Sequence, residues 1–221
     1  MSKQKNPAIK LRKQGKSYSQ IKNFLNLSKS TLSSWLRDYP LSKERIRELR
    51  SADEQRIERY RETMRQKKEK RLKETYRLQK KKVLPFSKRD FFIAGLFLYW
   101  AEGTKSRKCG LSMTNSDPSL LKFFIDWLNV CFYVSRDKLK IHLHLYADMD
   151  NEQEIRFWSK RLGVSRNQFT KSYIKTTLST RINHKGSFGH GTCNVTINRV
   201  LLAENVLMGL KVISDKYKKG M

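Results

Sequence analysis

The sequence IAGLFLYWAEG, at residues 93–103, is apolar on every side of a helix until it ends in Glu102 and Gly103. A helix of this composition has to be buried around its whole circumference. In a small domain the simplest solution packs the helix against a second copy of itself across a two-fold axis, and Ala94 and Gly95 allow a close approach. The pattern therefore predicts a homodimer in which two Glu102 side chains lie near each other.

The residues after this helix alternate between the period of a strand and the period of a helix. At 138–146 apolar and polar residues alternate strictly, and at 192–198 they do so again, as in half-buried strands. The other predicted elements are a strand about 111–113, a helix from Pro118, a helix about Trp158, a strand at 171–175 and a helix at 201–213. We therefore expect an α+β domain at 86–221, with helices on one face of an antiparallel sheet.

The polar side chains of these strands share one face of the predicted sheet and include no carboxylate. They are Ser112, Thr114, Lys140, His142, His144, Tyr146, Lys171, Tyr173, Lys175, Thr192, Asn194, Thr196 and Asn198. Lysine can contact phosphates, whereas asparagine, threonine and histidine can contact base edges. We expect this face to bind nucleic acid. The alternative is an ordinary solvated face, which would normally mix both charge signs.

The sequence offers little to a structural metal or a disulfide. His142 and His144 lie on one strand face, but no cysteine or acidic residue stands beside them at ligand spacing. Cys109, Cys131 and Cys193 form no C-x-x-C pair. The three cysteines predict free thiols in a reducing compartment, so the expected location is the cytoplasm, in association with the nucleoid.

The chain has 48 Lys and Arg against 20 Asp and Glu, a formal net charge of +28. A surface that cationic repels itself and is usually matched by a polyanion, first nucleic acid and then anionic membrane. The longest apolar run, 91–101, is shorter than the roughly 18 residues that a membrane span needs. The composition therefore favours nucleic acid as partner, with no membrane and no small-molecule substrate.

Residues 1–41 predict three short helices. An Asn-Pro pair at 6–7 would begin the first helix, Gly15 would end it, and SYSQ at 17–20 is a capping box for the second. The third helix would extend from a Ser28 cap to about Arg37. This spacing of caps and apolar residues indicates a small three-helix domain.

The segment QGKSYSQIKNFLNLSKSTLSSWLRD, residues 14–38, resembles the helix-turn-helix of resolvase-like and transposase-like DNA-binding domains. The resemblance implies that the third helix contacts the bases. Its exposed positions, none of them acidic, are Lys29, Ser30, Thr31, Ser33, Ser34 and Arg37. Short hydroxyls beside cations suit a helix that lies in a major groove. The alternative is a three-helix domain that binds a protein.

The segment 42–85 joins these two domains. Between Pro40 and Pro85 it contains no glycine or proline, which predicts one long charged helix of roughly 60 Å. Its apolar residues do not keep a heptad spacing. We expect a semi-rigid spacer between two DNA-contacting domains, or alternatively a solvated helix with intrahelical ion pairs such as Glu69 with Lys73.

The string IAGLFLYWAEG, with LSMTNSDPSLLKFFIDWL after it, resembles the LAGLIDADG homing-endonuclease family over about residues 88–213. The resemblance implies a saddle-shaped sheet in the major groove, a homodimer, and a metal-binding catalytic acid at the end of the motif, here Glu102. It also implies a basic residue in the catalytic pocket, for which Lys105, Lys171 and Lys175 are the candidates. Paired carboxylates above a phosphate-binding surface suit phosphodiester hydrolysis with Mg²⁺.

The sequence thus predicts a sequence-specific double-stranded DNA-binding protein of the LAGLIDADG type, and it leaves the question of cleavage open. One candidate function is a divalent-metal-dependent site-specific endonuclease. The other is a non-catalytic transcriptional regulator, because the family includes regulators that keep this domain beside a helix-turn-helix and do not cut DNA. An RNA-binding, maturase-like factor is a third alternative.

Overall fold

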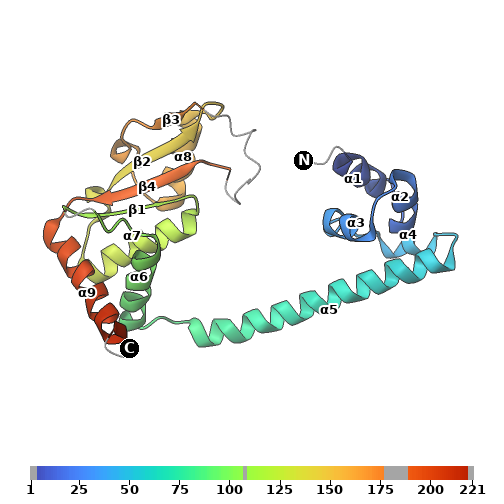
Figure 1. Cartoon of the computed structure of the whole chain (residues 1–221), viewed down its shortest axis with the longest axis horizontal. Coiled ribbons are helices and arrows are strands. Elements are labelled where there is room, and N and C mark those ends of the chain that lie inside the picture. Colours follow the sequence, from blue (N-terminus) through green and yellow to red (C-terminus); the bar gives the residue numbers. More distant parts are fainter. Residues whose placement is uncertain (1–3, 107–108, 177–188, 219–221) are drawn as a thin grey trace. The chain divides into compact units, whose positions relative to one another are not determined.

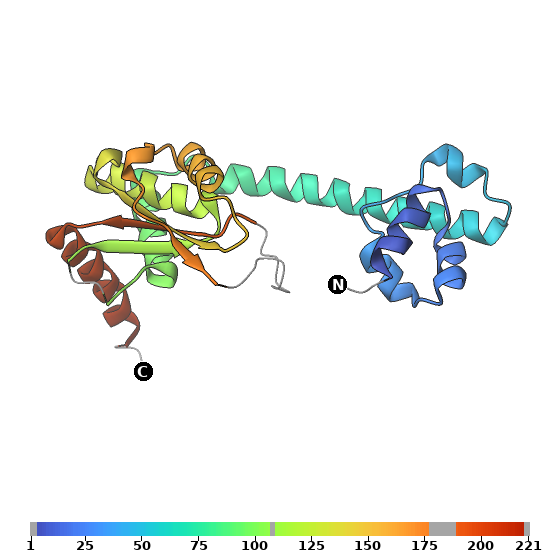
Figure 2. The same ribbon diagram turned by 90° about the horizontal axis from the view of Figure 1, so that it is seen from above.

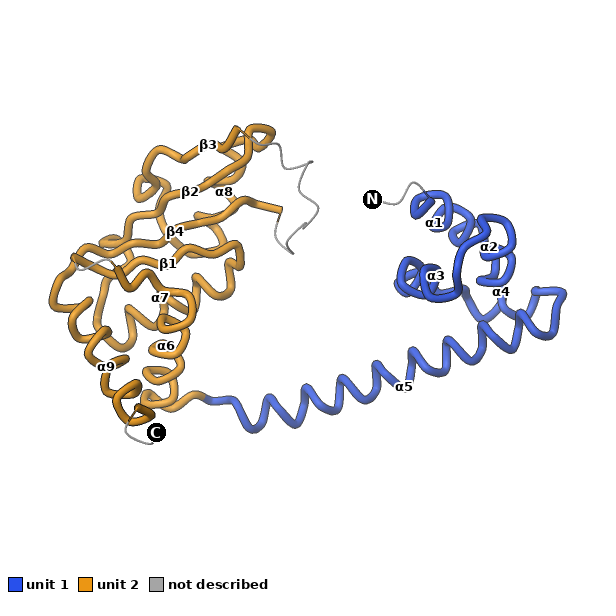
Figure 3. Tube along the Cα trace, in the orientation of Figure 1, with its two compact units in different colours: residues 1–85 blue, residues 86–221 orange. Residues whose placement is uncertain are grey.

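The chain forms two compact units, residues 1–85 and 86–221 (Figure 3). The computed structural model describes residues 4–106, 109–176 and 189–218. These residues form helices and one four-stranded sheet, so the chain has the α+β fold class that the sequence predicts. The first unit contains both the three-helix segment and the charged segment 42–85.

The three predicted helices of the first unit are α1 (Lys5–Lys13), α2 (Tyr18–Leu25) and α3 (Lys29–Trp35), shown in blue in Figure 1. The capping box at the start of α2 is present, because the backbone N–H of Gln20 donates to Ser17 Oγ and the N–H of Ser17 donates to Gln20 Oε1, both at 3.1 Å. The expected start of α1 is wrong by two residues, since Gln4 is its N-cap and Pro7 lies within its first turn.

The long charged helix predicted within 42–85 is present, but the prediction that it fills the whole segment is wrong. The structure has a short α4 (Lys43–Arg47) and then α5 (Ala52–Val83), which is 32 residues long. The chain breaks between them because Leu49 is buried, with only 3% of its surface exposed, and because Ser51 caps α5. The side-chain amide of Gln55 donates to the carbonyl of Leu49 at 2.6 Å and so holds the turn.

The described residues of the second unit form four α-helices, four strands and two short 3-10 helices, Arg136–Lys138 and Arg166–Gln168. Its helices are α6 (Lys88–Glu102), α7 (Pro118–Phe132), α8 (Asn151–Leu162) and α9 (Val200–Lys218). Its strands are β1 (Leu111–Asn115), β2 (Lys140–Tyr146), β3 (Tyr173–Lys175) and β4 (Thr192–Ile197). The sheet order is β1-β4-β2-β3, and Figure 2 shows the sheet from a second direction.

The sheet is mixed, so the predicted antiparallel sheet is wrong in one pairing. Strand β4 runs antiparallel to both β1 and β2, but β3 runs parallel to β2. The physical reason is the connection: α8 lies between β2 and β3 in the chain, and a helical crossover returns the chain to the same end of the sheet. Strand β3 is also shorter than the predicted strand at 171–175, since it begins at Tyr173 and Lys171 lies before it.

One hydrophobic core lies between the sheet and the helices. The apolar side chains of β2 and β4 are buried as the alternation predicts, among them Ile141, Leu143 and Val195, each with 0% exposure. They share the core with buried residues of the helices, including Trp127 of α7 and Trp158 of α8. The polar side chains of these two strands therefore point to the opposite face of the sheet.

Within one chain α6 is not buried on every side. Its residues Gly95, Leu96 and Tyr99 are buried, whereas Phe97 and Trp100 are 48% and 38% exposed. Gly95 has a use inside the chain, because a Cβ placed on it would lie 2.1 Å from the Trp127 ring. Gly95, which was expected to allow the close approach of a second copy of the helix, instead allows the close approach of α7.

Candidate nucleic-acid interface

The first part of the candidate interface is the exposed side of α3. Lys29, Ser30, Ser34 and Arg37 are exposed and Thr31 is half-buried, whereas Leu32 is buried in the three-helix core. The helix is capped by Ser28, whose hydroxyl accepts a hydrogen bond from the backbone N–H of Thr31. The structure thus brings most of the predicted α3 residues to one side.

Three hydroxyls of α3 are already engaged. Ser28 Oγ lies 2.8 Å from Ser30 Oγ and 2.8 Å from Thr31 Oγ1. Ser33 accepts a hydrogen bond of 3.3 Å from the Arg61 guanidinium of α5. Ser33 therefore faces α5 instead of the outer side of α3, which is a correction to its predicted position. Helix α3 ends at Trp35, so Arg37 lies just beyond it and not within it as predicted. Lys29 and Ser34 of α3, together with Arg37, are the exposed groups here for which the structure describes no hydrogen bond or ion pair.

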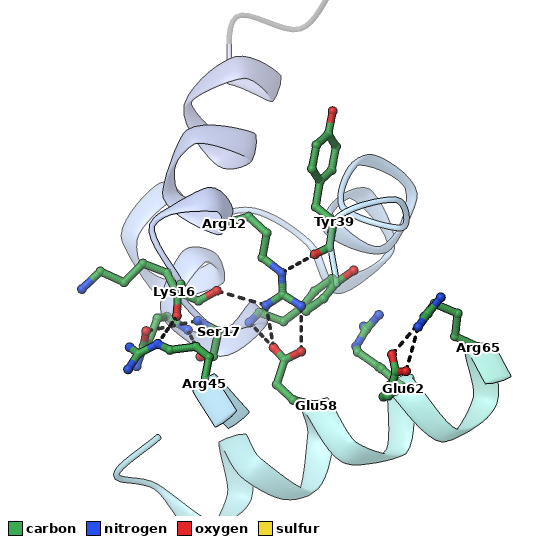
Figure 4. A network of polar contacts seen from close by, with 12 residues as sticks. Arg12, Lys16, Ser17, Tyr39, Arg45, Glu58, Glu62 and Arg65 are labelled. Carbon is green, nitrogen blue, oxygen red and sulfur yellow. Dashed lines mark hydrogen bonds and ion pairs between the residues drawn. The ribbon is translucent and has the colours of Figure 1, made fainter. Parts of the chain in front are cut away.

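A buried ion pair fixes α5 against the three helices (Figure 4). The Arg12 guanidinium donates to both carboxylate oxygens of Glu58, at 2.9 and 2.8 Å, and the two side chains are 2% and 3% exposed. Glu58 also accepts from the backbone N–H of Tyr18, and Arg12 donates to the carbonyls of Lys16 and Tyr39. This network determines how α5 lies against α1, α2 and α3.

The second part of the interface is the outer sheet face, meaning the outward side chains of the four strands. Cross-strand register arranges them in rows. The rows are Ser112–Thr196–Lys140, Thr114–Asn194–His142, Thr192–His144–Tyr173, and Tyr146–Lys175. None of the strand residues is acidic. The predicted residues of β2, β3 and β4 therefore do lie together, and Lys171 and Asn198 lie just beyond the strand ends.

Asn194 is the centre of a cross-strand hydrogen-bond network. Its amide nitrogen donates to Ser112 Oγ at 2.9 Å and to Thr114 Oγ1 at 2.6 Å, and its oxygen accepts from Thr196 Oγ1 at 2.6 Å. Ser112, expected to be exposed, is only 5% exposed beneath this network. Asn194 has no amide hydrogen left for a base edge, so its role on this face is to hold β1 and β4 in place.

The histidines and tyrosines form an aromatic cluster beside this network. The rings of His142 and His144 are 5.0 Å apart, and the ring of His144 is 5.7 Å from that of Tyr173. The ammonium group of Lys175 lies 4.9 Å from the centre of the Tyr146 ring. His142 Nδ1 is hydrogen-bonded to Thr170 Oγ1 at 2.9 Å. The cluster combines stacking surfaces with a cation on one edge of the sheet.

The environment of His144 disfavours its charged form. Burial, followed by the nearby His142 and Lys175, lowers the pKa of His144 below its ordinary value of 6.5. His142 and Lys175 are both basic and lower this pKa, whereas an anion placed over the cluster would raise it. His144 is therefore a group whose protonation depends on what binds to the outer sheet face.

Glu102 lies beside the opposite edge of the sheet. It is exposed at the end of α6, and its Oε2 accepts a hydrogen bond of 3.2 Å from the side-chain amide of Asn115 at the end of β1. Strand β3 is at the other edge, three strand spacings away, or roughly 14 Å. Lys171 and Lys175 therefore cannot share a pocket with Glu102 of the same chain, which leaves Lys105 as the candidate base near it.

One chain supplies a single carboxylate to the predicted metal site. Protein-bound Mg²⁺ usually takes one or two carboxylates together with phosphate oxygens and water. Among the residues that the structure describes, no group of three or more His, Cys, Asp or Glu could hold a metal. Glu102 therefore supplies one carboxylate to a site of this kind, which DNA phosphate oxygens and, in a dimer, a second Glu102 would complete.

The three cysteines differ in how far they are buried. Cys193 is buried in the core, and burial raises the pKa of its thiol far above the ordinary value. Cys131 is half-buried, and burial raises the pKa of its thiol as well. Cys109 is exposed. All three are free thiols, as the sequence predicts.

Comparisons with protein-family models, with curated proteins and with solved structures found no match to this chain. Within the described residues, no helix is both long enough and apolar enough to cross a membrane. The functional assignment therefore rests on the residues and their geometry.

Proposed function

We propose that the chain is a double-stranded DNA-binding protein of the LAGLIDADG type that contacts DNA through both of its units. The observation that carries the proposal is the outer sheet face, where polar, aromatic and cationic side chains occupy consecutive cross-strand rows with no carboxylate among them. A solvated face would mix charge signs. The exposed side of α3, with Lys29 and Ser34, and the adjoining Arg37 supply the second contact surface.

The contacts divide into two kinds on this proposal. Lys140 and Lys175 contact phosphates, which position the protein and supply affinity. Tyr173, His144 and Thr192 contact base edges. Asn194 does not, because its amide is already hydrogen-bonded to its neighbours. The Asn194 network keeps the face rigid, so that these contacts meet DNA in a fixed register.

Replacing Lys140 and Lys175 together with alanine is expected to weaken binding to duplex DNA about tenfold and to reduce the slope of log affinity against log salt by about two. Fluorescence anisotropy over a salt series measures both quantities. The matched control is the pair Lys122→Ala and Lys160→Ala, exposed lysines on α7 and α8. Equal losses in the two double variants would contradict binding through the outer sheet face.

DNA affinity is expected to rise as the pH falls from about 7 to 6. The pKa of His144 is depressed in the free protein by burial, His142 and Lys175. A phosphate near the cluster raises that pKa again, so binding takes up a proton and is favoured at lower pH. The free energy of unfolding instead falls as the pH falls, because the unfolded chain binds this proton more readily than the folded chain does. His144→Gln should flatten the pH dependence of binding, whereas His190→Gln should leave it unchanged.

We also propose that the chain forms a homodimer through the exposed side of α6. Phe97 and Trp100 stack on each other with ring centres 6.0 Å apart, and both remain partly exposed to solvent. An exposed aromatic pair on an otherwise apolar helix is typical of a surface that another protein covers. This packing would bring two Glu102 residues, each at the end of its α6, near a common axis.

Cleavage is the second candidate function, and the exposed position of Glu102 favours it. Two Glu102 side chains would hold Mg²⁺, and the metal would offset charge on the phosphate. Duplex DNA incubated with Mg²⁺ or Mn²⁺ should then be cut by the natural chain and not by Glu102→Gln, while both bind equally well. Tight binding by both without any cut would assign the chain to the non-catalytic regulators. Preference for structured RNA over duplex DNA would support the maturase-like alternative.

A further inference from the structure

The first unit contains an open groove of about 1510 Å³. One wall is formed by the end of α3 and the residues that follow it, including Leu36, Pro40 and Leu41. The other wall is the part of α5 from Arg56 to Leu72. Arg12 and Glu58 also line the groove, and the buried ion pair between them, drawn in Figure 4, holds the start of α5 against the three short helices.

Large apolar side chains of α5 line the groove without being covered. Tyr60, Met64 and Leu72 are 65%, 47% and 53% exposed. Their spacings of four and eight residues place them on one side of the helix. Leaving apolar surface in water costs roughly 25 cal/mol for each Å². These three side chains, here called the apolar strip, share the groove with Leu36, Leu41 and Ile57, although basic residues stand between Met64 and Leu72. Exposed apolar side chains that gather along one groove indicate a surface that another molecule covers.

The charges of the groove are unbalanced in favour of cations. Its acidic residues on α5 are already engaged, since Glu58 pairs with Arg12 while Glu62 and Glu69 both pair with Arg65. Lys67, Lys68 and Arg71 also line the groove, and none of them has an ion pair within the described part of the chain. The groove therefore combines an apolar strip with free positive charge.

This combination selects among the molecules that could fill the groove. A second copy of α5 would bring 13 basic side chains against 6 acidic ones, and the two helices would repel each other. The phosphate backbone of DNA would satisfy the cations, but it would leave Tyr60, Met64 and Leu72 against a charged surface. A helix with one apolar face and acidic flanks satisfies both features, because amphipathic helices bind grooves by apolar anchors three and four residues apart.

We propose that the groove of the first unit is a docking site for an acidic amphipathic helix of a partner protein. The apolar face of that helix packs on Tyr60, Met64 and Leu72, and its carboxylates lie opposite Lys67, Lys68 and Arg71. Binding of this kind does not depend on whether the chain binds DNA.

The test uses the full-length chain and a fluorescein-labelled synthetic peptide of about 20 residues, long enough to span roughly 30 Å as a helix. Its leucines are spaced three and four residues apart, and glutamate and alanine fill the remaining positions. Anisotropy should show saturable binding of this peptide. A second peptide of the same composition, with its leucines distributed around the helix, should bind at least about tenfold more weakly, because it cannot place them together on the apolar strip.

Two matched variants test whether the peptide binds in the groove. Leu72→Asp lies in the groove, and Leu78→Asp lies on the same helix outside it, with the natural leucines 53% and 47% exposed. Leu72→Asp should weaken peptide binding about tenfold or more, because an aspartate would be buried among apolar groups, whereas Leu78→Asp should not change it. Circular dichroism should show that both variants fold like the natural chain.

Three results would overturn the proposal. The first is equal binding of the two peptides, or equal effects of the two variants on peptide binding. The second is a loss of self-association in sedimentation that Leu72→Asp causes and Leu78→Asp does not, which would assign the groove to a second copy. The third is a loss of duplex DNA binding in Leu72→Asp with peptide binding unchanged, which would assign it to nucleic acid.

Discussion

Glu58→Ala is expected to destabilise the first unit by about 3–5 kcal/mol, which is the usual cost of removing one partner from a buried ion pair. The Arg12 guanidinium is 2% exposed and would remain buried without the carboxylate that accepts two of its hydrogen bonds. The backbone N–H of Tyr18 would lose its acceptor as well. Single domains are stable by only about 5–15 kcal/mol, so the loss would be a large part of the total.

Hydrogen–deuterium exchange of peptides from α1, α2 and α3 measures this effect without interference from the second unit. The matched control is Glu69→Ala on the same helix, where the carboxylate is half exposed and Arg65 keeps Glu62 as a partner. Its cost should stay below about 1 kcal/mol. The double variant Arg12→Met with Glu58→Leu should recover much of the lost stability, because no charge is then left buried. Similar protection in the two alanine variants would contradict the importance of the buried pair.

Local sequence patterns predict the local structure of this chain well. Strict alternation predicts which side chains of β2 and β4 face the core, because a strand places successive side chains on opposite faces. The serine and glutamine of the SYSQ box predict the start of α2, because both satisfy backbone N–H groups within one turn. The break before α5 also has a local signal, since Ser51 is followed by Glu54 three residues later, a pattern typical of a helix start.

Interactions across long sequence separations are the part that the sequence does not predict. Arg12 and Glu58 are 46 residues apart, and each occurs in a segment where charged residues are ordinarily solvated. The separation of Glu102 from Lys171 and Lys175 follows from the strand order β1-β4-β2-β3, which only the assembled sheet defines. Asn194 illustrates the same limit, because its residue type suits base contacts but its amide is used by Ser112 and Thr114 of the neighbouring strand and by Thr196 of its own strand.

Gly95→Ala in α6 is expected to destabilise the second unit by about 1–3 kcal/mol, the usual cost of overfilling a packed core. Helix propensity acts in the opposite direction, because alanine in a helix interior is favoured over glycine by about 1 kcal/mol. The steric effect should exceed it, since the new Cβ would lie 2.1 Å from the Trp127 ring. Trp127 is fully buried and donates to the Phe92 carbonyl at 3.1 Å, so its ring cannot move away without losing that hydrogen bond.

The matched control for Gly95 is Gly209→Ala in α9, where the nearest atoms to a new Cβ are the ends of the Leu96 side chain at 3.4 and 3.5 Å. That change should stabilise the unit by up to about 1 kcal/mol, so the two variants should shift thermal unfolding in opposite directions. Packing on Trp127 lies within one chain, and the effect of Gly95→Ala should therefore not depend on protein concentration. If Gly95→Ala instead kept the natural stability but prevented self-association, Gly95 would lie at the contact between two copies and its packing against α7 would be wrong.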